Sequence, residues 1–130
     1  MTTSKQDSAR ETAELMASMM KRELYVVINR PLVPMAQMQN NLHAHLLYMI
    51  ELEKAGTLFA SGPLSGPGGE MTGEGITIIR ASSLEDAEAV ASKDPFVLAN
   101  QRESQVRKWI VNEGRITVSI DISTATAALP

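Results

Sequence analysis

The sequence of 130 residues contains no cysteine. Without cysteine, the chain forms no disulfide, offers no thiolate nucleophile and cannot build the zinc sites of finger domains. No apolar run approaches the roughly 20 residues that a membrane-spanning helix needs. The polar N-terminus lacks the apolar core and cleavage site of a secretory signal. We therefore expect a cytoplasmic protein with no membrane partner.

Aromatic residues and clustered positive charges are also scarce. Aromatic residues make up 4% of the chain, and its formal net charge is −3. Surfaces that bind nucleic acids need clustered Lys and Arg, and RNA-recognition sheets also need aromatic residues on central strands. The scattered basic residues and the few strand aromatics do not fit either surface. We therefore expect no nucleic-acid partner.

The pattern of apolar residues predicts one α+β domain. Strands are expected at residues 23–29, 57–64, 76–81, 105–111 and 115–122. Helices are expected at residues 35–55 and 82–94, the second with a capping box made by Ser82 and Glu85 and a stop before Pro95. The order β-α-β-β-α-β, with an extra C-terminal hairpin strand around the turn at 112–114, is typical of the ferredoxin-like fold.

The domain is expected over residues 21–122, between an N-terminal extension (1–20) and a tail (123–130). Residues 1–8 are expected to be disordered, and residues 9–22 have the composition of a helix. The first strand, 23–29, is apolar on both faces, so both faces need a cover. Either the helix at 9–22 covers the open face or, more simply, the chain self-associates there as a homodimer or higher homo-oligomer.

Both histidines of the chain lie in the helix expected at 35–55. At about 100° per residue, His43 and His45 point about 200° apart and cannot bind one metal ion together. His43 lies at the border of the apolar stripe and is expected to reach solvent. His45 lies inside the stripe, where it is either a core histidine held by one hydrogen bond or a residue that transfers protons.

Two longer motifs resemble the YCII-related (YciI-like) family. They are "HLLYMIELEKAGTLFASGPL", which begins at His45, and "SSLEDAEAVASKDPFV", which begins at Ser82. The resemblance covers residues 23–122 and leaves out the N-terminal extension. It implies a dimeric α+β barrel, in which two ferredoxin-like sheets pack face to face. It also implies a pocket with a His–Asp pair, which falls on His45 and Asp94.

The resemblance suggests a role for each of these residues. A carboxylate that accepts a hydrogen bond from imidazole fixes its tautomer and stabilises its protonated form. We therefore predict His45 as the general acid/base and Asp94 as its orienting partner, although Asp94 before Pro95 also fits a simple helix cap. Further candidates for substrate binding are Arg30, Tyr48, Ser61, Gly62 and Phe96. For Arg30 and Tyr48, ordinary surface and packing roles are the simpler interpretation.

The family resemblance implies a small-molecule enzyme that needs no cofactor. The expected reaction is isomerisation or elimination, of the lyase or dehydrochlorinase type, on an oxygenated ring compound of aromatic or secondary metabolism. The alternative is a non-catalytic, dimeric protein that binds a small ligand. No metal is expected, although His45 and Asp94 would supply two ligands. The Gly-rich segment 65–75 leads into a strand, which excludes a phosphate cradle and leaves a flap or a plain connection.

Overall fold

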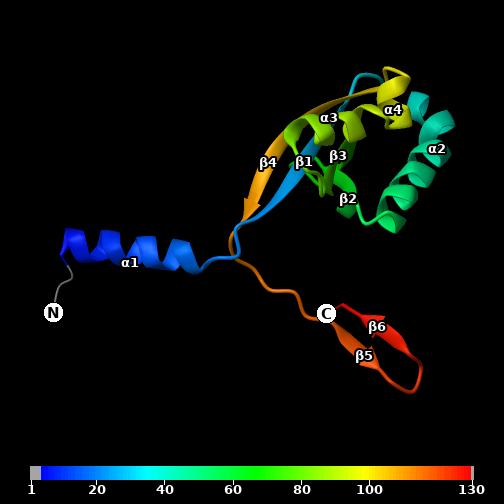
Figure 1. Cartoon of the computed structure of the whole chain (residues 1–130). Coiled ribbons are helices and arrows are strands. Elements are labelled where there is room, and N and C mark those ends of the chain that lie inside the picture. The colour runs from blue at the N-terminus through cyan, green and yellow to red at the C-terminus, as the bar shows by residue number, and fades with distance from the viewer. Residues whose placement is uncertain (1–3, 130) are drawn as a thin grey trace. The chain divides into compact units, whose positions relative to one another are not determined.

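The computed structural model describes residues 4–129 and divides the chain into two units. Residues 23–110 form one compact unit, and the segments on either side of them belong to the other. The elements in chain order are α1 (Lys5–Ser18), β1 (Arg22–Pro31), α2 (Met35–Lys54), β2 (Leu58–Ser65), β3 (Met71–Ile79), α3 (Leu84–Ser92), α4 (Pro95–Leu98), β4 (Arg102–Val111), β5 (Ser119–Asp121) and β6 (Thr126–Ala128) (Figure 1). None of the described helices has both the length and the apolar character of a membrane span.

The compact unit contains a four-stranded sheet with the order β2-β3-β1-β4. β3 pairs antiparallel with β1 on one side, where Tyr25 lies opposite Ile79, and with β2 on the other. This strand order, with helices after the first and third strands, is that of the ferredoxin-like fold. The predicted α+β ferredoxin-like class is therefore confirmed.

The core lies between the sheet and the helices. Tyr25 and Val27 of β1 and Ile79 of β3 are at most 3% exposed, and they pack against Ala87 and Ala91 of α3. Alternate residues of a strand point to the same face, so these three strand residues share the helix-covered side. The alanines of α3 are small, and this allows the helix to approach the sheet closely.

Several boundaries within the compact unit differ from the prediction, among them the end of α3 at Ser92 rather than at residue 94. β3 begins at Met71, inside the expected Gly-rich loop, and β4 begins at Arg102 rather than at residue 105. The N-cap of α3 is Ser83, whose side chain accepts a hydrogen bond from Asp86 N at 3.0 Å, and not Ser82 with Glu85. Each boundary depends on a pairing or capping contact that apolar periodicity does not reveal.

The segment after β4 pairs differently from the prediction. Only residues 119–121 of the expected strand at 115–122 are extended, and they pair with β6 in a separate two-stranded sheet. The turn at 112–114 therefore does not return the chain onto β4, and the expected tail contains β6. Ile120 is 68% exposed and Ile122 is 93% exposed, because this small hairpin has no buried face. Residue 130 lies outside the described residues.

The helix α1 begins earlier than expected. The side chain of Ser4 accepts a hydrogen bond from Asp7 N at 3.1 Å and caps the helix, which starts at Lys5. Serine is a favoured N-cap, and an acidic residue in the first turn adds stability. The disorder predicted for residues 1–8 therefore does not extend to residues 5–8, and residues 1–3 lie outside the described part.

Candidate active site

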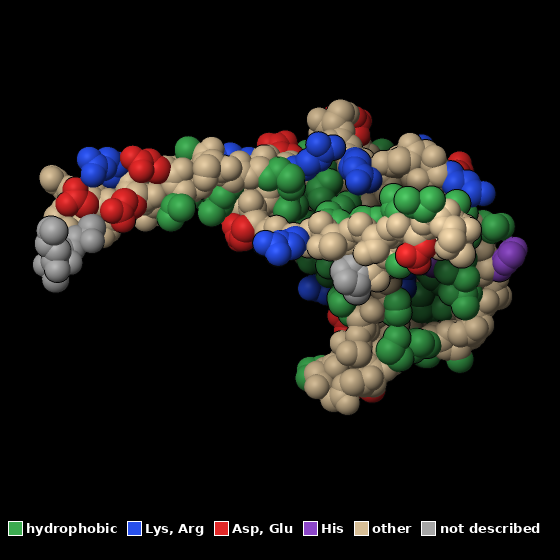
Figure 2. Space-filling model, turned by 90° about the horizontal axis from the view of Figure 1, so that it is seen from below, with side chains coloured by type: hydrophobic (Ala, Val, Ile, Leu, Met, Phe, Trp, Pro, Cys, Tyr) green, Lys and Arg blue, Asp and Glu red, His purple; other side chains and the backbone are tan. Residues whose placement is uncertain are grey.

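A cavity of about 470 Å³ lies within the compact unit. It is lined by Asn29, Met35, Met38, Gln39, Leu42, His45, Leu46, Met49, Ser61, Gly62, Pro63, Met71, Gly73, Glu74, Gly75, Ile76, Thr77, Phe96 and Arg102. In Figure 2, hydrophobic side chains gather around a hollow in the right-hand part of the molecule. A mostly apolar cavity with a few polar groups is typical of small-molecule sites.

The apolar stripe of α2 serves the core and the cavity in different places. Met38 and Met49 are buried, whereas Leu42 is 38% exposed and Leu46 is 49% exposed. All four side chains belong to the cavity lining. The same helix places His45 between them, partly buried, while His43 is exposed. The periodicity of α2 therefore separates the two histidines as expected.

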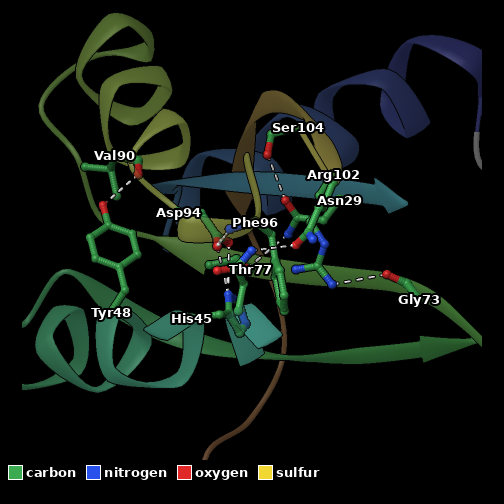
Figure 3. A network of polar contacts seen from close by, with 12 residues as sticks. Asn29, His45, Tyr48, Gly73, Thr77, Val90, Asp94, Phe96, Arg102 and Ser104 are labelled. Atoms are coloured by element: carbon green, nitrogen blue, oxygen red, sulfur yellow. Dashed lines mark hydrogen bonds and ion pairs between the residues drawn. The ribbon is translucent and has the colours of Figure 1, made fainter. Parts of the chain in front are cut away.

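His45 lines the cavity and contacts Asp94, which is not itself part of the cavity lining (Figure 3). Nδ1 of His45 lies 3.0 Å from both carboxylate oxygens of Asp94. The side chains are 14% and 6% exposed, respectively. An ionised carboxylate only accepts hydrogen bonds. The donor must therefore be Nδ1 of His45, and we assign the imidazole proton to this nitrogen. In the neutral ring, Nε2 is then left free to accept a proton.

The carboxylate of Asp94 is itself held by the backbone. Asp94 is the N-cap of α4, and its Oδ1 accepts a hydrogen bond from Phe96 N at 3.0 Å. Pro95 occupies the first position of α4, where its missing N–H costs nothing. One side chain thus caps α4 and contacts His45, and the cap lies at the start of α4 rather than, as expected, at the end of the preceding helix. The cap fixes the carboxylate in the orientation that the imidazole needs.

Phe96 lies between His45 and Arg102 in Figure 3. The His45 ring stacks on the Phe96 ring with centroids 4.6 Å apart and an interplanar angle of 27°. Cζ of Arg102 lies 4.8 Å from the Phe96 centroid, within the range of a cation–π contact. Arg102 also donates from Nη2 to the carbonyl oxygen of Gly73 at 3.1 Å. Burial lowers the pKa of Arg102, and the negative charge of Asp94 acts in the opposite direction.

Three polar side chains link the strands behind the cavity. Nδ2 of Asn29 donates to Thr77 Oγ1 at 3.3 Å, and Ser104 Oγ donates to Asn29 Oδ1 at 2.8 Å. Asn29 is 2% exposed and Thr77 is 7% exposed. Buried polar groups destabilise a protein unless they are paired. This series of hydrogen bonds therefore links three neighbouring strands, β4, β1 and β3.

The structure brings some of the predicted residues together and leaves others apart. Ser61, Gly62 and Phe96 line the cavity with His45. Arg30 is exposed and is not part of the lining, because strand alternation turns it away from the side of Asn29. Tyr48 is also outside the lining of this cavity.

Tyr48 makes a structural contact between two helices. Its hydroxyl donates to the carbonyl oxygen of Val90 in α3 at 2.7 Å. Burial raises the pKa of Tyr48, and the charges of Asp94 and Glu51 raise it further. The hydroxyl is therefore neutral at physiological pH and links α2 to α3.

The sequence did not point to five polar residues of the cavity lining, which are Asn29, Gln39, Glu74, Thr77 and Arg102. Asn29 continues the alternation of Tyr25 and Val27, so a polar residue on the core face of a strand was the available signal. Arg102 was assigned to a connecting segment because β4 was expected to begin three residues later. Among residues 4–129, no group of three or more His, Asp or Glu is placed to hold a metal ion.

Comparisons with known proteins show a family and a solved structure of similar fold. The 5-chloro-2-hydroxyhydroquinone dehydrochlorinase TftG of Burkholderia phenoliruptrix AC1100, solved in complex with 2,5-dihydroxybenzoquinone, is similar in structure, with a TM-score of 0.56 and 25% sequence identity. The similarity covers 66% of this chain and 92% of that one. No curated protein matches the chain significantly. The sequence profile of the YCII-related domain matches residues 20–110. The chain therefore belongs to the YCII-related domain family.

Proposed function

We propose that this protein is an enzyme that isomerises or eliminates a group from an oxygenated ring compound, with His45 as general acid/base and Asp94 as its orienting partner. The observation that carries the proposal is the contact of Nδ1 of His45 with both carboxylate oxygens of Asp94 at 3.0 Å. The similarity to TftG, named as a dehydrochlorinase, supports a lyase-like reaction on a hydroxylated ring. Such a pair needs no cofactor for proton transfer.

The proposed reaction begins at Nε2 of His45. This nitrogen accepts a proton from a ring hydroxyl or a ring carbon, and the electron pair of the broken bond moves into the ring. In an elimination, that pair forms a C=C or C=O bond while the leaving group departs from a saturated ring carbon with the electron pair of its broken bond. An aromatic phenol such as 5-chloro-2-hydroxyhydroquinone first moves a hydroxyl proton to the carbon that bears the chlorine, which makes that carbon saturated. In an isomerisation, the imidazolium returns the proton to another ring atom. Asp94 stabilises the imidazolium in both cases, because its carboxylate remains hydrogen-bonded to Nδ1.

The test is release of chloride from 5-chloro-2-hydroxyhydroquinone by the purified protein. We expect His45→Ala to lower the rate by about 10²–10⁴-fold, which is the usual contribution of general acid–base catalysis. His43→Ala is the matched control, since His43 lies exposed on the same helix, and it should retain the wild-type rate. Equal rates in His45→Ala and wild type would contradict the proposal.

The second candidate function is ligand binding without chemistry. The same cavity, with His45 acting only as a hydrogen-bonding group, would bind a hydroxylated ring and leave it unchanged. In that case 2,5-dihydroxybenzoquinone would raise the melting temperature, because a ligand stabilises the state that it binds. Stabilisation without turnover of any chlorinated or hydroxylated ring compound would favour this function.

We also propose that the open face of the sheet is covered by a second copy of the chain. Val26 pairs with Ile78 across β1 and β3, and Ile28 lies two residues further along β1 on the same face. These three apolar side chains are only half-buried, and Trp109 of β4 is 40% exposed. Ile78→Lys should convert a dimer to a monomer in sedimentation experiments, because it places a charge in the centre of this face. A wild-type monomer at all concentrations would contradict the proposal.

A further inference from the structure

Arg102 is a charged group in a largely apolar cavity, and it lacks a counter-ion. Among residues 4–129, no carboxylate oxygen lies within 4.0 Å of its guanidinium. Nη2 donates to the carbonyl oxygen of Gly73, and the plane of the guanidinium lies near the face of Phe96. Nε is buried and has no hydrogen-bond partner. The residue is thus held in place but not neutralised.

This arrangement is costly unless something else compensates for it. Arg102 is partly buried, and a charge that is withdrawn from water is normally paired with an opposite charge. One carbonyl oxygen, one aromatic face and the more distant charge of Asp94 compensate only in part. The described part of the cavity lining contains one carboxylate residue, Glu74, whose Oε1 accepts a hydrogen bond from Thr72. The incompletely compensated charge therefore favours an anion that enters the cavity from solution.

The position of Arg102 relative to His45 restricts what this anion is. The Phe96 ring lies between the two side chains, at 4.6 Å from the His45 ring and 4.8 Å from Cζ of Arg102. A ligand that contacts both must therefore present two polar groups at separate positions. A planar ring with an ionised oxygen on one side and the reacting atom on the other fits this requirement.

We propose that Arg102 anchors an ionised oxygen of the substrate, so that the substrate class is a planar ring that carries a phenolate, enolate or carboxylate away from the atom that His45 deprotonates. The proposal deepens the function proposed above and rests on it for the role of His45. The guanidinium fork suits planar oxygen anions. Its positive charge also stabilises the negative charge that develops on the ring as the proton leaves.

Gly73 and Gly75 of β3 lie next to the guanidinium. Gly73 has a φ of +88°, and an added Cβ would lie 3.2 Å from Met35 and Pro31, so glycine is required there. Its carbonyl oxygen is the acceptor of the Arg102 hydrogen bond. A Cβ on Gly75 would lie 3.7 Å from Nη2 of Arg102. The guanidinium thus lies against the backbone of β3 at the cavity, where Gly73 supplies its hydrogen-bond acceptor.

The test compares two probes that share a ring but differ in charge. The first, 2,5-dihydroxybenzoquinone, is ionised at neutral pH, and the second, 2,5-dimethoxybenzoquinone, is uncharged. We expect calorimetry to show that the wild-type protein binds the ionised probe at least about tenfold more tightly, as one charge-assisted contact predicts. In Arg102→Gln this preference should disappear through weaker binding of the ionised probe. Arg107→Gln is the matched control, since Arg107 is an exposed arginine of the same strand.

A third variant provides a test if Arg102→Gln does not fold. Arg102→Lys keeps the charge and loses the planar fork, so it should keep part of the preference. If Arg102→Gln is unfolded in circular dichroism, Arg102→Lys decides: a preference as large as that of the wild type would overturn the anchoring role of the fork, and a reduced one supports it. An equal preference in folded Arg102→Gln and wild type, or no preference in the wild type, would also overturn the proposal.

Calorimetry keeps this inference separate from the proposed reaction. If His45→Ala binds the ionised probe with the wild-type preference, the anchor is independent of the acid/base group, as we expect. A preference that depends on Arg102 in a protein without turnover would support the anchor and contradict the reaction. If turnover depends on His45 but the preference for the ionised probe is the same in Arg102→Gln and wild type, the role of Arg102 is contradicted and the proposed reaction is not.

Discussion

The two ends of the helix-covered face of the sheet serve different purposes on the same strands. At one end, Val27 and Ile79 are packed under α3 in the core. One alternate position further along β1 and β3, Asn29 and Thr77 are just as buried, but they are polar and line the cavity. A single step along each strand therefore separates residues that stabilise the fold from residues that shape the site.

The difference shows where this domain tolerates a polar interior. At the core end, small residues of α3 exclude water, and polar groups would remain unpaired. At the cavity end, Asn29 connects Thr77 to Ser104, and Arg102 finds a carbonyl oxygen and an aromatic face. The strands thus remain paired while the surface that they present changes. Each prediction below changes one end and leaves the other unchanged.

The largest effect is expected at the cavity end, from Asp94→Asn. Asparagine is as good an N-cap as aspartate, so the hydrogen bond from Phe96 N should persist and the fold should remain. The amide nevertheless presents a donor to Nδ1 of His45, which favours the wrong tautomer. We expect turnover to fall about 100-fold or more. Chloride release measures the rate, and ¹⁵N NMR of the imidazole should show the proton move from Nδ1 to Nε2.

A different result would separate the two roles of Asp94. If turnover falls while the imidazole keeps its proton on Nδ1, the carboxylate acts by its charge and not by fixing the tautomer. If the rate does not change, the pair has no part in the reaction. Asp94→Ala removes the cap as well and should lower the melting temperature, which Asp94→Asn should not do.

At the core end, Ile79→Ala is expected to destabilise the fold strongly. Ile79 is fully buried, and truncation of such a side chain leaves a cavity that costs about 2–5 kcal/mol of unfolding free energy. Urea unfolding measures the loss. Binding of 2,5-dihydroxybenzoquinone by the folded fraction should remain unchanged, because Ile79 is not part of the main cavity lining. Weaker binding by folded protein would show that the two ends are coupled.

A smaller loss is expected from Asn29→Ala. The substitution leaves Thr77 and Ser104 without the side chain that joins them, and unpaired buried groups typically cost about 1–3 kcal/mol. Thr77→Val is the matched variant, since it keeps the shape of Thr77 and removes one hydrogen bond, so its urea midpoint should shift less. A larger shift of the urea midpoint for Thr77→Val than for Asn29→Ala would mean that packing, and not the hydrogen bonds of Asn29, stabilises this part of the sheet.

The sequence predicted the elements with strong periodicity and missed features that depend on distant partners. The 3.6-residue period of α2 placed His45 toward the interior and His43 toward solvent, and the structure agrees. Spacing along one helix gives no distance to a residue 49 positions away, so the approach of Asp94 rested on a family resemblance. Its contact with His45 exists because a short helix after α3 turns the carboxylate inward.

The missed features share one physical cause. The start of β4 at Arg102 depends on the neighbouring strand, and the separate hairpin of β5 and β6 depends on the absence of a partner for residues 115–118 within the described chain. Local alternation in "RITVSIDI" predicts a strand but does not specify its partner. The existence of a strand was therefore easier to predict than its pairing. Arg102 was missed because it is the first residue of β4, and the start of β4 depends on pairing with the neighbouring strand.

The smallest effect is expected where α2 and α3 meet, between the two ends, from Tyr48→Phe. Loss of the hydrogen bond to the carbonyl oxygen of Val90 should cost about 0.5–1.5 kcal/mol of unfolding free energy at pH 7. The change leaves the main cavity lining intact, so turnover should stay within about twofold of wild type, a difference of less than about 0.5 kcal/mol in activation free energy. Urea unfolding and chloride release measure the two quantities.

The effect of Tyr48→Phe should also depend on pH. Burial raises the pKa of Tyr48 in the folded protein, so the stabilisation from its neutral hydroxyl is fully present below the ordinary tyrosine value of about 10. It is lost as the pH rises through the raised value, because the unfolded chain then ionises more readily than the folded one. The difference in urea midpoint between wild type and Tyr48→Phe should therefore be constant from pH 7 to about 9 and shrink above about 10. A difference that grows with pH would mean that the folded protein favours the phenolate, which would place Tyr48 near a positive charge rather than among the carboxylates of Asp94 and Glu51.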